Sequence, residues 1–354
     1  MLLRTKQVAK YIPEDIKEIA AILGDNENDC YIVGGGIRDL LIAKHPKEFD
    51  LATDASPETV QNLFEKTIPT GIKYGTVTII YNEAQYQITT FRTEGKYSDG
   101  RHPDQVEFTK DIKRDLARRD FTINAIAYNA VNFEMVDEFN GLEDLKNGII
   151  RAVGDPRKRL EEDGLRAFRG IRFAAQLNFK IEEQTEAAIV EFIKDWPNLA
   201  SKERIHDELI KILNTEQPSL GLNYLNFPNI DQYDKQVRLA ALIKDKPELI
   251  DLIQEKKEKR WVERLLKYDL NLKKALLQVT DLKVDGIDLM ELGLRGENIG
   301  QMQEKLLDII VERKSLNKKD KLIEIAKNIM AGKELELPGV DKEIMLPKGE
   351  VEIV

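Results

Sequence analysis

Short apolar and β-branched runs alternate with glycines and polar turns over the first 150 residues. These runs predict strands at 30–33, 49–53, 76–81 and 86–91, with the last two joined as an antiparallel hairpin. Apolar periodicity predicts helices at 13–24 and 55–66, and an apolar helix followed by a strand within 120–137. Because helices and strands alternate in this way, residues 1–150 are predicted to form one α/β domain.

Beyond residue 155 the pattern becomes almost entirely helical and continues so to residue 330. Predicted helices cover 159–176, 182–195, 201–214, 234–243, 247–269, 271–280, 297–314 and 318–331. We predict a head domain at 1–150 followed by three all-α domains, a neck at 151–215, a body at 216–285 and a tail at 286–354. The sequence leaves the arrangement of residues 335–354 open.

The composition narrows the class of protein. Hydrophobic residues make up 42% of the 354 residues and charged residues 33%, which is usual for a globular protein. No run approaches the ~18 apolar residues of a membrane span and residues 1–20 do not resemble a secretion signal, so we expect a cytoplasmic protein. The single cysteine, Cys30, excludes an intrachain disulfide and a multi-cysteine zinc site. Monomer and homodimer both stay open.

The net charge of −9 taken alone argues against binding to nucleic acid. Lysines and arginines nevertheless cluster at 110–119, 151–172 and 254–267. Local basic patches matter more for phosphate binding than the sum over the chain. The charge distribution is therefore compatible with an RNA substrate.

A glycine run, Gly34-Gly35-Gly36, stands between an apolar strand and a predicted helix. Glycines let backbone N–H groups approach a phosphate closely, and a helix beginning there favours an anion. Arg38 adds a forked cation that suits a triphosphate. The run taken alone is equally typical of an ordinary tight turn.

Two carboxylates follow the glycine run. Glu48 stands directly before the predicted strand 49–53, and Asp50 lies within it. Alternate residues of a strand point to the same side, so we expect both carboxylates on one face. Such a pair holds a divalent metal between the protein and nucleotide phosphates. An isolated E-x-D is more often a solvated strand end, but its spacing from G-G-x-x-R makes the combination much rarer.

Together these motifs resemble the head of the class II nucleotidyltransferases of the polymerase β superfamily, specifically the bacterial CCA-adding enzyme and poly(A) polymerase family. Further segments resemble the family in its own order, at 75–77, 89–92, 97–106, 115–125, 162–166 and 286–300. The resemblance covers roughly residues 20–330. It implies a polymerase β-like head with a small mixed or antiparallel sheet, followed by all-α neck, body and tail domains.

The chain departs from the family pattern at two positions. The first metal-binding carboxylate is usually Asp in the family and is Glu48 here. Glu is one methylene longer, so its rotamer or the backbone must adjust to the near-octahedral shell of Mg²⁺ at ~2.1 Å. A third acidic position, often Glu in the family, is Gln87, which supplies no negative charge. We expect these changes to affect the rate more than the reaction class.

The resemblance implies a reaction in which the 3′-hydroxyl of tRNA attacks the α-phosphorus of CTP or ATP and pyrophosphate leaves. Two Mg²⁺ ions, held by Glu48 and Asp50, are implied as cofactors. The implied nucleotide-binding residues are Gly34, Gly35, Arg38, Arg92, Arg118, Arg119, Asp120, Asn124, Asp163, Arg166, Arg169 and Arg172. The helical body and tail are implied to grip the acceptor stem and TΨC arm of the tRNA.

Asp163 and Arg166, three residues apart, are predicted neighbours on one helix, and the resemblance assigns them the choice of base. Cytosine and adenine both present an amino donor beside a ring-nitrogen acceptor, which match an Asp acceptor and an Arg donor. Uracil and guanine reverse this order and leave both partners unsatisfied. An ordinary surface ion pair is the alternative interpretation of the two residues.

Related activities share these motifs. The intact segment 97–106 disfavours a CC-adding enzyme, and the lack of a long basic C-terminal extension disfavours a poly(A) polymerase. An A-adding enzyme stays open, and Glu48 and Gln87 motivate a further alternative, a tRNA-binding protein without catalysis. His206-Asp207 resembles part of a metal motif, but His45 and His102 are too distant in sequence to complete it.

Overall fold

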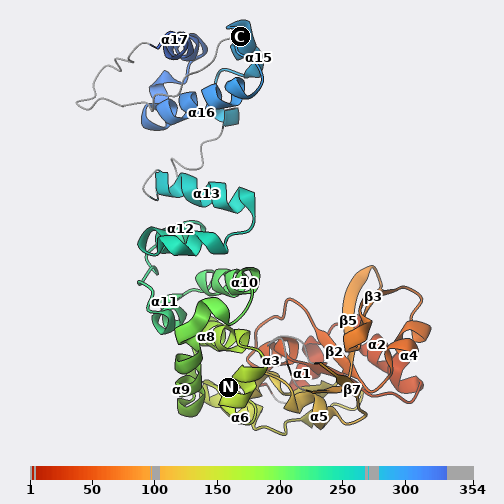
Figure 1. Cartoon of the computed structure of the whole chain (residues 1–354). Coiled ribbons are helices and arrows are strands. Elements are labelled where there is room, and N and C mark those ends of the chain that lie inside the picture. The colour runs from red at the N-terminus through yellow and green to blue at the C-terminus, as the bar shows by residue number, and fades with distance from the viewer. Residues whose placement is uncertain are drawn as a thin grey trace. The chain divides into compact units, whose positions relative to one another are not determined.

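The structure is a computed structural model that describes residues 2–3, 5–95, 97, 104–267, 270 and 279–332. The chain divides into two compact units, Met1–Gln254 and Glu255–Val354 (Figure 1). The predicted domain boundaries at 150, 215 and 285 stay predictions. The predicted helix at 271–280 lies largely outside the described residues, and segment 335–354 lies entirely outside them.

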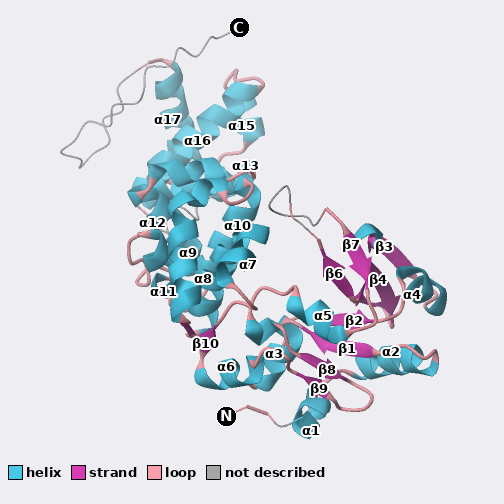
Figure 2. Cartoon of the chain, turned by 60° about the horizontal axis from the view of Figure 1, so that its bottom comes forward, coloured by secondary structure: helices cyan, strands magenta, loops and turns pink. Residues whose placement is uncertain are grey.

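A seven-stranded mixed sheet forms the centre of the head (Figure 2). Its strands, in spatial order, are β3 (Thr67–Gly71), β4 (Thr76–Tyr81), β5 (Ala84–Thr90), β2 (Asp50–Thr53), β1 (Cys30–Val33), β8 (Ala127–Asn129) and β9 (Met135–Val136). β2 and β5 run parallel, and the other neighbouring pairs run antiparallel. The predicted small mixed sheet is thereby confirmed, as is the hairpin of β4 and β5.

Two short strand pairs lie outside this sheet. β6 (Arg92–Glu94) pairs antiparallel with β7 (Val106–Phe108), so they join the two ends of the segment predicted as a loop at 97–106. Residues 98–103 of that segment lie outside the described residues. β10 (Ile149–Ile150) pairs in parallel with β11 (Lys180–Ile181) and ties the end of the head to the helices that follow.

Two helices of the head, α4 and α5, begin at side-chain caps. Ser56 caps α4 through the Thr59 N–H, and Asp111 caps α5 through the Lys113 N–H, as expected for short polar side chains. The head helices are α1 (Thr5–Val8), α2 (Glu14–Asp25), α3 (Gly35–Leu41), α4 (Pro57–Leu63), α5 (Ile112–Ala117) and α6 (Gly141–Asn147). Single 3-10 turns lie at Ala9–Tyr11 and Ile72–Tyr74.

The predicted apolar helix within 120–137 is wrong. The structure has a single 3-10 turn, Thr122–Asn124, followed directly by β8 and then by the short strand β9. Every residue from 120 to 130 is buried. A segment buried on all sides is apolar throughout, so periodicity does not distinguish a helix from two short elements.

The remainder of the described chain is helical, as predicted. The helices are α7 (Pro156–Glu162), α8 (Leu165–Leu177), α9 (Glu183–Phe192), α10 (Lys202–Leu213), α11 (Ser219–Leu222), α12 (Lys235–Asp245), α13 (Lys256–Lys267), α15 (Gly286–Glu291), α16 (Glu297–Glu312) and α17 (Lys319–Met330). 3-10 segments lie at Ile193–Asn198, Asn223–Leu225, Pro247–Leu252, Val279–Asp281 and Lys314–Leu316. No helix in the described part of the chain combines the length and hydropathy that a membrane span requires.

Two of the predicted long helices are divided in the structure. The helix predicted at 159–176 is broken at Asp163 and Gly164, because Asp163 adopts an extended conformation with φ −149°. A Cβ on Gly164 would lie 2.9 Å from the Leu199 carbonyl oxygen, so the backbone approaches another segment closely there. The helix predicted at 247–269 is divided into Pro247–Leu252 and α13.

Arg238 on α12 joins two segments of the first unit through backbone carbonyls. The buried guanidinium donates to the carbonyls of Leu213, Thr215, Tyr233 and Asp231, at 2.8, 2.7, 2.9 and 3.4 Å. Replacing Arg238 with methionine keeps an apolar stem but leaves these carbonyls without their donor. We expect the free energy of unfolding in urea to fall by about 3 kcal/mol.

The matched control for Arg238 is Lys235→Met on the same helix. Lys235 is exposed and pairs with Glu216 at 2.7 Å, so its loss is expected to cost under about 0.5 kcal/mol. Equal losses in the two variants would contradict a special role for Arg238.

Candidate active site

A cavity of about 1240 Å³ opens in the first unit, between the glycine loop of the head and helices of the neck. The predicted site residues that line it are Gly34, Gly35, Arg38, Glu48, Asp50, Arg118, Arg119, Asp120, Asn124, Asp163, Arg166, Arg169 and Arg172. Arg92 is not among the lining residues. The fold therefore brings into one cavity residues that lie more than a hundred positions apart in the sequence.

The glycine loop passes close to charged side chains of the cavity. Gly34 has φ +69° and ψ −136°, a backbone conformation that residues other than glycine rarely adopt. A Cβ on Gly34 would lie 3.3 Å from Arg119 Nη1 and 3.7 Å from Asp50 Oδ2, and one on Gly36 would lie 3.2 Å from the Glu48 carbonyl oxygen. Glycine is therefore needed here both for backbone conformation and for close approach.

The carboxylates Glu48 and Asp50 line the same cavity, but they do not share a strand as predicted. β2 begins at Asp50, so Glu48 lies in the preceding loop. Burial raises the pKa of the Asp50 carboxyl above its ordinary value, the negative charge of Glu48 raises it further, and Arg119 acts against both. Asp50 thus lies within electrostatic reach of a second carboxylate and of a cation.

Gln87 lies beside Asp50. The two residues are register partners in the parallel pair of β2 and β5, so their side chains project from the same face of the sheet. The third acidic position implied by the family resemblance is therefore adjacent to the carboxylates, although an amide occupies it in this chain.

Asp115 on α5 orients the two arginines of the sequence motif. Its carboxylate, 1% exposed, accepts from Arg118 Nε at 2.9 Å, Arg118 Nη2 at 2.8 Å and Arg119 Nη2 at 3.1 Å. Burial alone would raise the pKa of Asp115, but Arg119 and Arg118 together hold it below its ordinary value. Asp115 therefore stays charged and fixes both guanidinium groups at the cavity.

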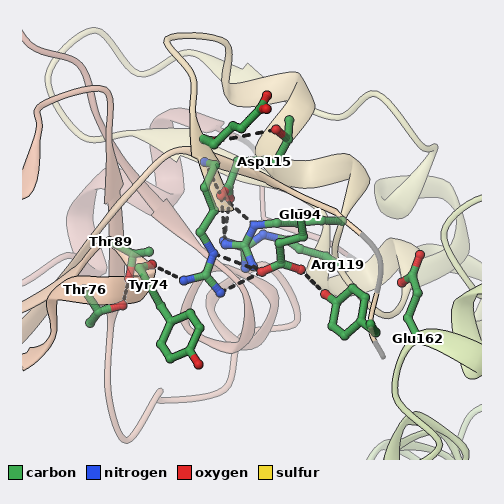
Figure 3. A network of polar contacts seen from close by, with 12 residues as sticks. Tyr74, Thr76, Thr89, Glu94, Asp115, Arg119 and Glu162 are labelled. Carbon is green, nitrogen blue, oxygen red and sulfur yellow. Dashed lines mark hydrogen bonds and ion pairs between the residues drawn. The ribbon is translucent and has the colours of Figure 1, made fainter. Parts of the chain in front are cut away.

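Figure 3 shows the polar network around Glu94 and Asp115, and Arg92 hydrogen-bonds to both of these residues. Its guanidinium donates to Glu94 at 2.9 and 2.7 Å and to the carbonyl of Tyr74. Glu94 also accepts from Arg118 Nη1 at 3.0 Å and from the Tyr97 hydroxyl. Arg92 is thus linked to the cavity-lining arginines through Glu94 and, by its backbone N–H, through Asp115 at 3.3 Å. The sequence interpretation missed Glu94, although a carboxylate two residues after Arg92 was an available signal.

The prediction that Asp163 and Arg166 are neighbours on one helix is wrong, and the alternative of an ion pair between the two described side chains is not found either. Asp163 lies in the break between α7 and α8, where it accepts the Leu165 N–H at 3.0 Å and pairs with Arg204 Nη2 at 2.7 Å. Arg166 instead pairs with Glu162 and donates to the carbonyls of Arg159 and Arg118 at 3.0 and 3.2 Å. Both residues still line the cavity, with Arg204 beside them, which the sequence did not single out.

Asp120 and Asn124 connect the head to α8. Asp120 accepts from Arg169 Nη2 at 2.6 Å, from the Phe121 N–H at 2.8 Å and from Asn124 Nδ2 at 3.1 Å. Asn124 Oδ1 in turn accepts from Arg38 Nη1 at 2.8 Å. Burial would raise the pKa of Asp120, but Arg169 and these hydrogen bonds hold it far below its ordinary value.

Asp120 is expected to make the stability of the first unit depend on pH. Because its pKa is lowered in the folded state, its contribution is complete above the unfolded pKa of about 3.9 and is lost as the pH falls toward the folded value. Asp120→Asn is expected to cost about 2 kcal/mol at pH 7, because the buried acceptor of the hydrogen bonds from Arg169 and Asn124 loses its charge. The difference from wild type should shrink by about 1.4 kcal/mol per pH unit below about pH 3.9.

Urea unfolding at pH 7, 4 and 3 tests this expectation. Asp155→Asn is the control, since Asp155 caps α7 and asparagine caps a helix equally well. A cost of Asp120→Asn that is the same at pH 7 and pH 3 would contradict the assignment.

Comparison with known proteins agrees with this architecture. Residues 30–151 match the family model of the poly A polymerase head domain, and residues 178–226 match that of a probable RNA and SrmB-binding site of polymerase A. The CCA-adding enzyme of Lactobacillus helveticus (strain DPC 4571) is 52% identical over 193 residues, which are 54% of this chain and 47% of that protein. The chain spans about half the length of the first curated relatives that it matches.

Solved structures are similar over most of the chain. The crystal structure of the Bacillus stearothermophilus CCA-adding enzyme in complex with CTP is 25% identical, with a TM-score of 0.59, covering 90% of this chain and 98% of that one. The Thermotoga maritima CCA-adding enzyme complexed with tRNA is 19% identical, with a TM-score of 0.60, covering 93% of this chain and all of that one. The fold and the family resemblance predicted from the sequence are confirmed.

Proposed function

We propose that this chain, which belongs through its head to the family of poly(A) polymerases and CCA-adding enzymes, builds the 3′-terminal CCA of tRNA from CTP and ATP. The observation that carries the proposal is that Glu48 and Asp50 line the same cavity as Asp163 and Arg166. The cavity contains carboxylates, a glycine loop that a phosphate can approach closely, and donors and acceptors for the edge of a base. These are the groups that nucleotidyl transfer requires.

The triphosphate of the incoming nucleotide fits the head side of the cavity. Gly34 and Gly35 present backbone at close approach, and Arg38, Arg118 and Arg119 supply guanidinium forks for the phosphate oxygens. A triphosphate bound there would leave its α-phosphorus open to in-line attack by the RNA 3′-hydroxyl. The arginines would stabilise the charge that develops on the leaving pyrophosphate. Asn124, which bridges Arg38 and Asp120, lines the same cavity and is assigned to the ribose.

Glu48 and Asp50 fit the family's divalent metal. Mg²⁺ in nucleotide sites usually takes one or two carboxylates and completes its shell with phosphate oxygens and water. The raised pKa of Asp50 reflects burial and repulsion by Glu48, which a cation between them would relieve. Mg²⁺ bound there would activate the attacking hydroxyl and neutralise the phosphates.

Base selection is assigned to Asp163 and Arg166. Asp163 accepts from an exocyclic amino group and Arg166 donates to the adjacent ring nitrogen, an arrangement that cytosine and adenine share. Arg204 pairs with Asp163 and holds that carboxylate in place, while Glu162 holds Arg166. Both base-reading groups therefore have a fixed orientation before the nucleotide enters.

The RNA partner is proposed to be the acceptor stem and TΨC arm of tRNA. Support comes from the match of residues 178–226 to an RNA-binding model and from the Thermotoga maritima relative, which is complexed with tRNA. The cytoplasmic location expected from the sequence stays a prediction, as does the choice between monomer and homodimer.

Incubation of the protein with tRNAs that lack CCA, CA or the final A, each with CTP or ATP separately, tests the proposal. The CCA-adding function requires C on the first two substrates and A on the third. Addition of A alone to the third would favour the A-adding enzyme, and runs of A on any RNA would favour a poly(A) polymerase. Binding of tRNA without incorporation under every condition would overturn the catalytic proposal.

A further inference from the structure

Three arginines surround the ring of Phe173 on α8. The guanidinium carbons of Arg172, Arg38 and Arg169 lie 4.1, 5.1 and 5.5 Å from the ring centroid. The ring is 3% exposed, lines the cavity and packs edge-on against Phe121, with centroids 5.8 Å apart and an interplanar angle of 85°. One aromatic side chain is thus a shared neighbour of three cations.

These contacts join the two sides of the cavity. Arg38 belongs to α3 in the head, whereas Arg169 and Arg172 belong to α8 in the neck. Each guanidinium also has a polar partner on another element, Asn124 for Arg38, Asp120 for Arg169 and Glu208 for Arg172. The partners are different, so Phe173 is the contact that all three have in common.

The three arginines give a physical reason for an aromatic residue at position 173. Three like charges within a few ångströms of one side chain repel one another, and the proximity of Arg169 contributes to lowering the pKa of Arg172, after burial. The face of an aromatic ring attracts a guanidinium within about 6 Å, whereas an aliphatic side chain of similar size offers no such attraction. Leucine at this position would fill much of the space without holding the cations.

We infer that Phe173 is a positioning residue for the nucleotide, because it holds three guanidinium groups in the arrangement that receives the triphosphate and sugar. The inference rests on the proposed function only for the identity of the ligand. Phe173 does not touch the reacting atoms. It sets the position of Arg38 in the head relative to Arg169 and Arg172 in the neck.

The test compares Phe173→Leu with Phe168→Leu in the full chain. Phe168 lies on the same helix, is 1% exposed and packs edge-on against Trp196, but has no cation–π contact within the described residues. Binding of CTP, ATP and inorganic tripolyphosphate is measured by calorimetry, and the free energy of unfolding by urea. Phe173→Leu is expected to weaken binding of all three by about tenfold, and Phe168→Leu to leave it unchanged at a similar loss of stability.

Rescue and kinetics complete the test. Phe173→Tyr and Phe173→Trp keep an aromatic face and are expected to restore binding, and Phe173→Leu should raise the nucleotide KM more than it lowers kcat. Equal binding by Phe173→Leu and wild type, or failure of both aromatic variants to restore it, would overturn the inference. A wild-type chain that binds no nucleotide would instead overturn the proposed function, so the two failures are distinguishable.

Discussion

Replacing Asp50 with asparagine is expected to lower nucleotide incorporation by about a thousandfold while tRNA binding is unchanged. Asparagine has the shape of aspartate but no charge, so the cavity would lose the carboxylate that lies beside Gly34 and Arg119. Incorporation of radiolabelled CTP and ATP measures the first quantity, and a gel-shift titration with tRNA measures the second.

The control for this change is Asp54→Asn, a few residues along the same segment. Asp54 accepts the Asp29 N–H at 2.8 Å and does not line the cavity, and asparagine keeps an acceptor oxygen. Activity should therefore stay near wild type. Should Asp50→Asn retain wild-type incorporation at saturating Mg²⁺, the assignment of the catalytic carboxylates would be wrong.

Replacing Asp163 with alanine is expected to reduce the preference for CTP and ATP over UTP and GTP by about 10- to 100-fold. In the proposed function, uracil and guanine are rejected because they place a carbonyl against the carboxylate, and alanine would remove that repulsion. The measurement is the ratio of kcat/KM values for the four nucleotides, which separates selectivity from overall rate. Arg204→Ala is expected to have the same effect in weaker form, because Arg204 holds Asp163 in place.

Glu161→Ala is the control for selectivity, since Glu161 is an exposed residue of α7 two positions before Asp163. It should leave all four nucleotide ratios unchanged. Wild-type selectivity in Asp163→Ala would remove the carboxylate from base reading. Reduced selectivity in Glu161→Ala as well would point to a general disturbance of the break between α7 and α8.

Local signals in the sequence were sufficient where one element carries its own pattern. The hairpin of β4 and β5 has β-branched runs on both sides of Asn82 and Glu83, whose positive φ angles of 46° and 67° close the turn. The glycine loop could also be predicted, because the positive φ of Gly34 is a local property of the turn and does not depend on distant residues. The hairpin and the conformation of the glycine loop could therefore be predicted from local sequence signals.

Features that depend on contacts between distant segments could not be read in the same way. The break at Asp163 depends on the close approach of Gly164 to Leu199, thirty-five positions along the chain. Arg204 meets Asp163 across a similar separation, and nothing in the helix 202–213 distinguishes it from other surface arginines. A sequence pattern indicates which face of a helix or strand is buried, but not which residues of a distant segment pack against that face.

The arginines around the cavity have a consequence for turnover. All seven that line it already hold a carboxylate, in the pairs Arg38–Asp39, Arg118–Asp115, Arg119–Asp115, Arg166–Glu162, Arg169–Asp120, Arg172–Glu208 and Arg204–Asp163. Their rotamers are preorganised, so an arriving anion freezes little side-chain entropy. The same carboxylates compete with the anion for each donor, which keeps its dwell time short. If the proposed function holds, such an arrangement suits an enzyme that must release an anionic product after each addition.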